Sequence, residues 1–326
     1  MIRNRSARRT TTRTILAVVI AAVVLLGLFA IAIGGNAGVG LQAVLTGLLV
    51  GGVYGLVAMG LALIFGVLGI INFAHGALMA LAMYGAYALA SQAGMDPYLA
   101  IVVIVPFLFV LGAAIQFFLV GRVLGGAAES QLLLTLGLAI IIENLMLAIF
   151  TATPKTVNVP YIGTRLPDGL HLGSAVASTQ LLIAFVGSML LGGLLYLLLH
   201  RTPLGTAIRA VAENPRGAVL VGVDVRRIYV LTFALGGACV GAAGTLMLPF
   251  VAVSPTTGDQ FNIVAFVVVV LGGLGNVPGA LAGGLIIGLI QYLGGAALPQ
   301  VNNLLLVFAV FVLTLLFRPQ GLFGRT

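Results

Sequence analysis

Three polar side chains stand within long apolar runs of this sequence, where any chemistry takes place in a hydrocarbon environment. Asn72 and His75 lie in "IINFAHGALMA" (70–80), and Glu143 lies in "GLAIIIENLMLAIF" (137–150). An ionised side chain at the centre of a membrane costs about 2.5–3.5 kcal/mol on insertion scales, so such groups face a cavity, pair with a partner or become neutral. These residue types can contact a polar solute or relay a proton.

The remaining reactive residues do not form a site typical of an enzyme. The three histidines, His75, His171 and His200, are far apart, and Cys239 is the only cysteine, so no disulfide or thiolate metal cluster can form within the chain. The only lysine, Lys155, follows "TATP", so the G-x-x-x-x-G-K-[ST] phosphate loop is absent. The sequence therefore predicts no catalytic residue, no metal site and no bound cofactor, and ATP hydrolysis would need another subunit.

Each of the three polar residues also has a structural interpretation. Non-helical backbone inside a membrane needs hydrogen-bond partners, which an Asn or a His beside a helix break supplies. For Asn72 the pattern favours this structural role, whereas His75 fits a translocation path equally well. Glu143 is the one acid clearly within a predicted span, and a proton relay requires a chain of such groups. We therefore expect Glu143 to make a polar contact in the interior.

The composition indicates a membrane protein. Of 326 residues, 61% are hydrophobic and 7% are charged, against about 25% charged residues in soluble domains. The net charge of +8 follows the positive-inside pattern and indicates topology, not nucleic-acid binding. All basic residues except Lys155 and Arg165 flank apolar runs on the side predicted to be cytoplasmic: Arg3, Arg5, Arg8, Arg9, Arg13, Arg122, Arg201, Arg209, Arg216, Arg226, Arg227, Arg318 and Arg325.

At about 20 apolar residues per span, the sequence predicts an all-α polytopic protein with about eight spans. Residues 1–14 form a basic cytoplasmic N-terminus and 15–326 a single transmembrane domain. The run 15–33 is longer than the 7–15 residues of a signal-peptide core and predicts a retained anchor. The further predicted spans are 41–66, 74–90, 98–120, 131–150, 181–199, 228–251 and 304–317.

The segment 262–293 is predicted to be broken or re-entrant. Its apolar runs, 263–274 and 280–293, are each short for a span and are separated by "GGLGNVPG". One span here would place the C-terminal "RPQGLFGRT" outside, whereas an out-and-back hairpin of two short helices places its arginines inside. We therefore expect the hairpin.

Two interrupted segments resemble each other. "LGIINFAHGAL" (68–78) and "LGGLGNVPGAL" (271–281) share Leu-Gly, six residues, and Gly-Ala-Leu, although chance explains the match equally well in a chain rich in these residues. Paired interrupted segments in two halves of a transporter indicate a binding site. The candidate substrate-path residues are accordingly Asn72, His75, Glu143 and Asn276.

The largest predicted cytoplasmic stretch, 200–227, is too short for a domain. It predicts short helices at 207–212 and 215–221, with Gly222 ending the second. Charges of both signs alternate with small apolar residues, which suits docking onto another protein better than a solvated loop: Arg209, Glu213, Arg216 and Asp224.

Four motifs together resemble the permease subunits of bacterial branched-chain (LIV-type) amino acid ABC importers. They are "GGVYGLVAMGLALIFGVLGIINFAHGALMALAMYGAY" (51–87), "RTPLGTAIRAVAENPRGAVLVGVDVRRIYVLTFALGG" (201–237), "VVLGGLGNVPGALAGGLIIGLIQ" (269–291) and "RPQGLFG" (318–324). The resemblance covers nearly the whole chain after the first span.

The resemblance implies a multi-pass subunit of the bacterial inner membrane with both termini in the cytoplasm. It implies a second permease, identical or homologous, around a central path, and an extracytoplasmic binding protein that docks on the outer loop 151–178. Two ATP-binding subunits would grip the cytoplasmic stretch through Arg209, Glu213, Asn214, Arg216, Gly222 and Asp224.

The substrate stays open at this level. The family commonly has Gln-Asn where this chain has Glu143–Asn144, and related permeases carry urea, short amides or other amino acids. An ion-coupled secondary carrier is an alternative from a different class, and the absence of a second acid in the predicted spans argues against it.

Overall fold

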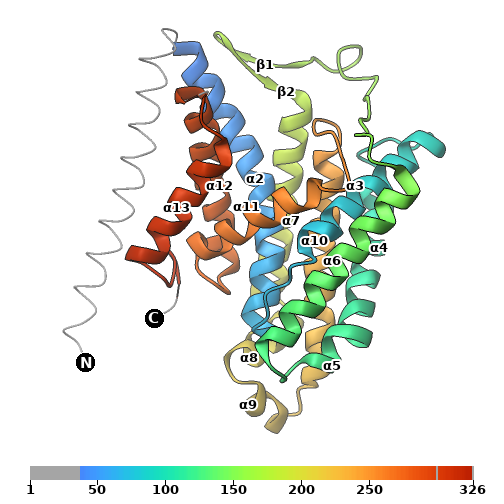
Figure 1. Ribbon diagram of the computed structural model, residues 1–326, viewed down its shortest axis with the longest axis vertical. Coiled ribbons are helices and arrows are strands. Elements are labelled where there is room, and N and C mark those ends of the chain that lie inside the picture. Colours follow the sequence, from blue (N-terminus) through green and yellow to red (C-terminus); the bar gives the residue numbers. More distant parts are fainter. Residues whose placement is uncertain (1–36, 299, 325–326) are drawn as a thin grey trace.

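The computed structural model describes residues 37–298 and 300–324, so the predicted span 15–33 and the basic N-terminus lie outside the described residues. The chain is mainly helical (Figure 1). The helices are α2 (Ala37–Leu68), α3 (His75–Gln92), α4 (Ile101–Ile115), the π-helical η1 (Gln116–Val120), α5 (Gly121–Val123), α6 (Ala128–Phe150), α7 (Thr179–Arg201), α8 (Pro203–Glu213), α9 (Pro215–Leu220), α10 (Val225–Met247), α11 (Thr257–Gly272), α12 (Val277–Ala297) and α13 (Asn303–Phe317). Strands β1 (Gly169–Leu172) and β2 (Ala175–Ser178) form an antiparallel hairpin.

Within the described residues, six helices are long and apolar enough to cross a membrane. They are α2, the continuous helix Ile101–Val123 formed by α4, η1 and α5, and then α6, α7, α10 and α12. Helices α11 and α13 are apolar but shorter. The predicted all-α, multi-pass architecture is therefore confirmed in outline.

Helix α2 is the centre of the packing. It is almost entirely buried, and α7, α10, α11 and α12 pack against it, whereas most of the side chains of α4, α6 and α7 are open to the surroundings. Figure 1 shows α8 and α9 at one end of the helices and the β1–β2 hairpin at the other. The molecule thus has two polar ends joined by a core around α2.

Glycines allow α2 and α12 to approach backbone to backbone. A Cβ added to Gly284 of α12 would lie 2.5 Å from Cα of Gly55, and one added to Gly51 of α2 would lie 2.8 Å from the Gly284 carbonyl oxygen. Small residues at a helix interface permit this close packing, which stabilises helix pairs in membranes. Because these contacts run from Gly47 to Gly55 of α2, they extend over about 12 Å of helix.

The segment 262–293 differs from the prediction of two short helices. Helix α11 is short, but α12 runs from Val277 to Ala297 and is long enough to cross a membrane. Asn276 caps this helix by accepting a hydrogen bond from the Gly279 amide at 3.0 Å, and the small residues after 293 continue it. The prediction of a short second helix is wrong, because the observed helix begins before residue 280, at Val277, and continues past residue 293 to Ala297.

Glycine packing between α2 and α12 gives a testable prediction. Gly284→Ala should lower the free energy of unfolding by about 1–3 kcal/mol, because the new methyl group overpacks the backbone contact. Its matched control is Gly193→Ala in α7, where an added Cβ meets nothing within 4 Å; this change should stabilise by up to about 1 kcal/mol. Cys239 is buried, so a thiol-reactive fluorogenic dye reports thermal unfolding. Equal midpoints for the two variants would contradict the packing.

Candidate functional site

Two helices begin inside the bundle and meet at their first turns. Residues 69–74 connect α2 to the start of α3 at His75, and residues 248–256 connect α10 to the start of α11 at Thr257. Gly76 and Gly258 cross at backbone contact: a Cβ on Gly258 would lie 2.6 Å from the Gly76 carbonyl oxygen, and a Cβ on Gly76 would overlap the Gly258 carbonyl. The two interrupted helices are therefore fixed against each other at this crossing.

Side chains at the crossing pair with backbone amides that lack a helical partner. The Asn72 side-chain oxygen accepts a hydrogen bond from the Ala74 amide at 3.1 Å, and that of Asn262 accepts one from the Gly76 amide at 3.3 Å. The Thr257 hydroxyl accepts a hydrogen bond from the Ser254 amide at 2.8 Å. Helix starts leave free amides, and a membrane interior offers no water to pair them. Asn72 therefore has the structural role that the sequence favoured.

His75 is completely buried between α3 and α2. Its Nε2 lies 3.0 Å from the Val57 carbonyl oxygen, in the middle of α2. Among the described residues, His75 Nδ1 and Asn72 Nδ2 have no hydrogen-bond partner. An unpaired buried polar atom costs about 1–3 kcal/mol. The break thus holds two polar atoms whose hydrogen-bonding capacity this conformation does not use.

Two acidic side chains interact electrostatically near the crossing. Glu143 is half-buried about 10 Å before the Phe150 end of α6, and it interacts electrostatically with Asp259 in the first turn of α11. Asp259 lies outside the predicted apolar run 263–274 and outside the six helices long enough to cross a membrane, so Glu143 remains the one acid within the predicted spans. The apolar run predicts the start of this helix at 263, whereas the helix begins at Thr257. The Thr and Asp in "PTTGDQF" are a typical helix-start signal.

Asn276 lies elsewhere. It caps α12, and its Nδ2 donates a hydrogen bond to the Phe323 carbonyl at 2.6 Å in the C-terminal tail. The preceding Gly275 packs against Gly66, near the end of α2. The structure therefore does not bring Asn276 together with Asn72, His75 and Glu143. The segment that meets 68–78 is the start of α11, and not 271–281 as the similar patterns suggested.

Residues that cap helices recur along the stretch 200–227, which the sequence predicts to be cytoplasmic. Thr202 accepts a hydrogen bond from the Gly205 amide at 3.0 Å at the start of α8, and Asn214 accepts one from the Gly217 amide at 3.0 Å at the start of α9. Asp224 caps α10 and forms an ion pair with Arg227 at 2.9 Å. Gly222 has a φ of +85°, which favours glycine. The two predicted helices are confirmed, and Asn214, Gly222 and Asp224 have structural roles.

The outer surface of α8 and α9 combines charge with apolar groups. Helix α8 buries Gly205, Ile208 and Val211 against α2, α7 and α10, which leaves its polar side facing outward. Arg209, Glu213 and Arg216 are exposed and form no ion pair within the described part of the chain. Leu220, at 88% exposure, stands between the exposed Val219 and Val221. We define this candidate docking surface as Arg209, Glu213, Arg216, Val219, Leu220 and Val221; the exposure of its three apolar members was not predicted from the sequence.

At the opposite end, the loop 151–178, which the sequence predicts to be the outer loop, is attached to the core. The Gln42 side chain of α2 makes two hydrogen bonds with the Val176 backbone, at 3.0 and 2.8 Å. Lys155 and Val253 exchange backbone hydrogen bonds at 2.8 and 2.9 Å, which joins the loop to the segment before α11. Burial and a hydrogen bond to Asp96 raise the pKa of Tyr161 to about 12, and this contact joins the loop to the α3–α4 connection.

Comparisons with known proteins identify the family of this chain. Residues 43–315 match the family model described as the permease component of branched-chain amino acid transport systems. The chain is 30% identical over 294 residues to the high-affinity branched-chain amino acid transport system permease protein BraD of Pseudomonas aeruginosa, covering 87% of this chain and 96% of BraD. It is 29% identical over 304 residues to LivH of Escherichia coli K12 (87% and 96%), and 33% identical over 289 residues to the probable LivH of Methanocaldococcus jannaschii (82% and 88%). No solved structure matches the chain.

The buried position of His75 gives a prediction. His75→Ala should lower the free energy of unfolding by about 2–4 kcal/mol, because it leaves a cavity and an unpaired Val57 carbonyl. His171→Ala, on the exposed face of β1, is the control and should leave stability unchanged. Dye-monitored thermal unfolding measures both. Wild-type stability of His75→Ala together with lost uptake would assign His75 to the translocation path instead of the scaffold.

Proposed function

The chain belongs to the family of permease components of branched-chain amino acid transport systems, and we propose that it carries a branched-chain or related amino acid across the inner membrane by alternating access. The match over residues 43–315 carries this conclusion. A permease component is not an enzyme class, and the sequence contains no phosphate loop. Separate ATP-binding subunits supply the energy.

The proposed topology has both termini in the cytoplasm. The arginines Arg201, Arg209 and Arg216 lie at the α8–α9 end, whereas Lys155 and Arg165 lie in the outer loop. The positive-inside rule therefore places α8 and α9 in the cytoplasm. Helix α11 runs inward from the crossing, α12 runs outward along α2, and α13 returns to the cytoplasmic side. The C-terminus therefore lies in the cytoplasm, as it does with the predicted re-entrant hairpin.

The proposed substrate path runs along the face that carries Glu143 and Asp259. Asp259 is exposed in the single chain, and lipid is an unfavourable environment for a carboxylate. A second permease, either another copy or a homologue, would enclose this face. Asn72 and His75 would lie behind it at the break, and Asn276 nearer the cytoplasmic end.

The pair of acids favours an amino acid over the alternative substrates of related permeases. An amino acid carries an ammonium group that two carboxylates attract, whereas urea and short amides carry no charge. The two acids therefore support an amino acid as the substrate. An ion-coupled secondary carrier would transport without any ATPase, which vesicles that contain only this chain and a proton or sodium gradient would show.

The two polar ends receive the proposed partners. The docking surface on α8 and α9 offers charge and the exposed Leu220 to the ATP-binding subunits. The outer loop offers a platform for an extracytoplasmic binding protein, and its bridge from Lys155 to Val253 leads directly to the start of α11. The ATP-binding subunits and the binding protein would thus act on the interrupted helices α3 and α11 through short segments of chain or through hydrogen bonds.

The docking surface gives a prediction about assembly. The double change Arg209→Ala and Glu213→Ala should reduce the ATP-binding subunit recovered with the purified permease by about tenfold, equivalent to 1.4 kcal/mol, because both charges face the partner. Recovery is measured by affinity purification of the co-expressed complex.

A matched control removes the same kinds of charge at the other end of the molecule. Arg165→Ala with Asp168→Ala lies in the outer loop and should leave ATPase recovery unchanged. Both double variants should keep the wild-type unfolding midpoint, because the side chains are exposed. Full ATPase recovery with Arg209→Ala and Glu213→Ala would remove these residues from the interface.

The acids give a prediction about uptake. Glu143→Gln with Asp259→Asn should lower ATP-driven uptake of a branched-chain amino acid about tenfold or more, because a hydrogen bond to a charged group contributes about 1.5–3 kcal/mol. Glu129→Gln, at the exposed start of α6, is the control. Uptake into proteoliposomes that contain the assembled transporter is the measurement. Unchanged uptake in the double variant would place the substrate elsewhere.

A further inference from the structure

A pocket of about 450 Å³ lies at the α8–α9 end of the helices, between the end of α4 and the start of α10. Its lining combines polar, cationic and apolar side chains. It is separate from the crossing of α3 and α11 and from the docking surface. The residues that line it are Gln116, Phe117, Phe118, Gly121, Arg122, Leu124, Val225, Arg226, Tyr229 and Val230.

The π-helical turn η1 directs a buried acceptor into this pocket. Gln116 is 2% exposed, and its side-chain oxygen has no hydrogen-bond partner among the described residues. Gly121 closes the turn, because a Cβ there would lie 2.8 Å from the Gln116 carbonyl oxygen. π-helical turns within α-helices are frequent at functional sites. The Gln116 oxygen therefore has its accepting capacity unused in this conformation.

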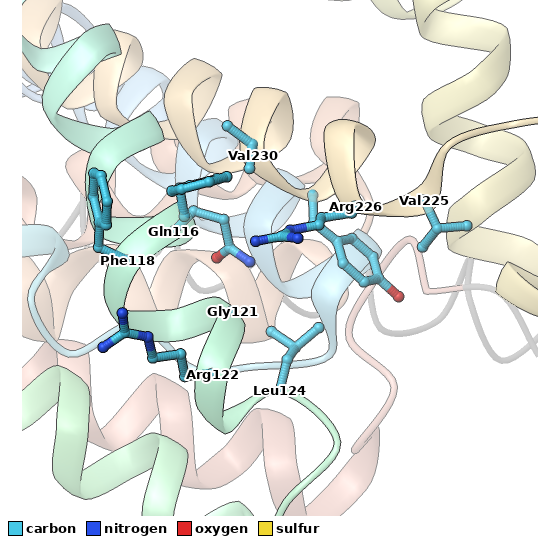
Figure 2. Close-up of a pocket in the computed structure, with 10 residues that line it drawn as sticks. Gln116, Phe118, Gly121, Arg122, Leu124, Val225, Arg226 and Val230 are labelled. Atoms are coloured by element: carbon cyan, nitrogen blue, oxygen red, sulfur yellow. The ribbon is translucent and has the colours of Figure 1, made fainter.

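Two arginines at the pocket lack a counter-charge. Within the described ranges, the ion pair at the start of α10 joins Arg227 to Asp224, and neither Arg122 nor Arg226 pairs with a carboxylate. The Arg226 guanidinium lies over the Phe117 ring, 4.8 Å from its centroid. Figure 2 shows the Gln116 amide and the Arg226 guanidinium directed toward the same space, with Arg122 and Leu124 below them. The site is therefore cationic and favours an anion.

Apolar side chains beside the pocket face outward from the helices. Phe117 and Phe118 are each about half exposed, and Leu119 is also exposed. Arginine binds phosphate oxygens through paired N–H donors, and basic pockets between membrane helices on the cytoplasmic side suit anionic headgroups. A ligand for this pocket thus has a phosphate group, a hydroxyl donor and an acyl chain.

We propose that this pocket binds the headgroup of an anionic phospholipid whose headgroup carries a hydroxyl, such as phosphatidylglycerol. Arg122 and Arg226 donate to the phosphodiester, and a headgroup hydroxyl donates to the Gln116 side-chain oxygen. The acyl chains lie against Phe117 and Phe118. The site requires only that this end of the helices lies at the membrane surface, and it does not depend on the transported substrate.

Lipid retention tests the site on the full-length chain. The protein is incorporated into vesicles with equal amounts of phosphatidylglycerol and phosphatidylcholine, extracted in detergent, and its retained lipids are quantified by mass spectrometry. Wild type should enrich phosphatidylglycerol at least about fivefold, and Arg122→Gln with Arg226→Gln should abolish the enrichment. Arg227→Gln is the matched control, because Arg227 neighbours Arg226 but pairs with Asp224 outside the pocket; it should retain the enrichment. If the double variant fails to fold, Arg122→Gln and Arg226→Gln are tested separately in the same assay.

The role of Gln116 is tested with a second lipid. Gln116→Leu should remove the preference for phosphatidylglycerol over phosphatidylmethanol, an anionic phospholipid without a headgroup hydroxyl, and it should keep the preference over phosphatidylcholine. Glycerol phosphate alone should not displace the lipid. Displacement by glycerol phosphate would show a site for soluble phosphate esters and overturn the proposal. Unchanged enrichment in the double arginine variant, accompanied by lost ATPase recovery, would overturn it in favour of a protein contact.

Discussion

Every backbone amide and carbonyl inside a membrane must find its partner within the protein, and this constraint organises the molecule around two interrupted helices. Helices α3 and α11 begin inside the bundle, where their free amides pair with side chains such as Asn72 and Asn262. Gly76 and Gly258 then allow the two first turns to touch. Polar groups that an apolar bundle excludes elsewhere are required here, which explains their presence in otherwise apolar runs.

The crossing is connected to both ends of the protein. On one side, the bridge between Lys155 and Val253 leads from the outer loop to the start of α11. On the other side, α8 packs on the ends of α2, α7 and α10, and α2 contacts His75 through the Val57 carbonyl. A displacement of either end therefore reaches the crossing through backbone elements, and alternating access in a permease without its own ATPase requires such connections.

The sequence predicts those parts of the fold that local signals determine. Apolar runs located α2, α6, α7 and α10. Gly222 as a stop signal located the end of α9 within one residue, at 221 against the observed Leu220. The apolar run alone predicts the start of α11 at 263, whereas the helix begins six residues earlier, at Thr257. The exposure of Leu220 depends on how α9 lies against its neighbours. The π-helical turn at Gln116 has no signal in the sequence, because the apolar residues around it predict an ordinary α-helix.

Accessibility of single cysteines at the two ends tests most directly whether the energy for transport enters from the cytoplasm through α8 and α9. With Cys239→Ser as background, Leu220→Cys probes α9 and Thr164→Cys probes the outer loop. A membrane-impermeant maleimide should label position 164 in intact cells and position 220 only in inside-out vesicles. Labelling of position 220 in intact cells would place the docking surface outside, where ATP-binding subunits cannot reach it, and would contradict the mechanism.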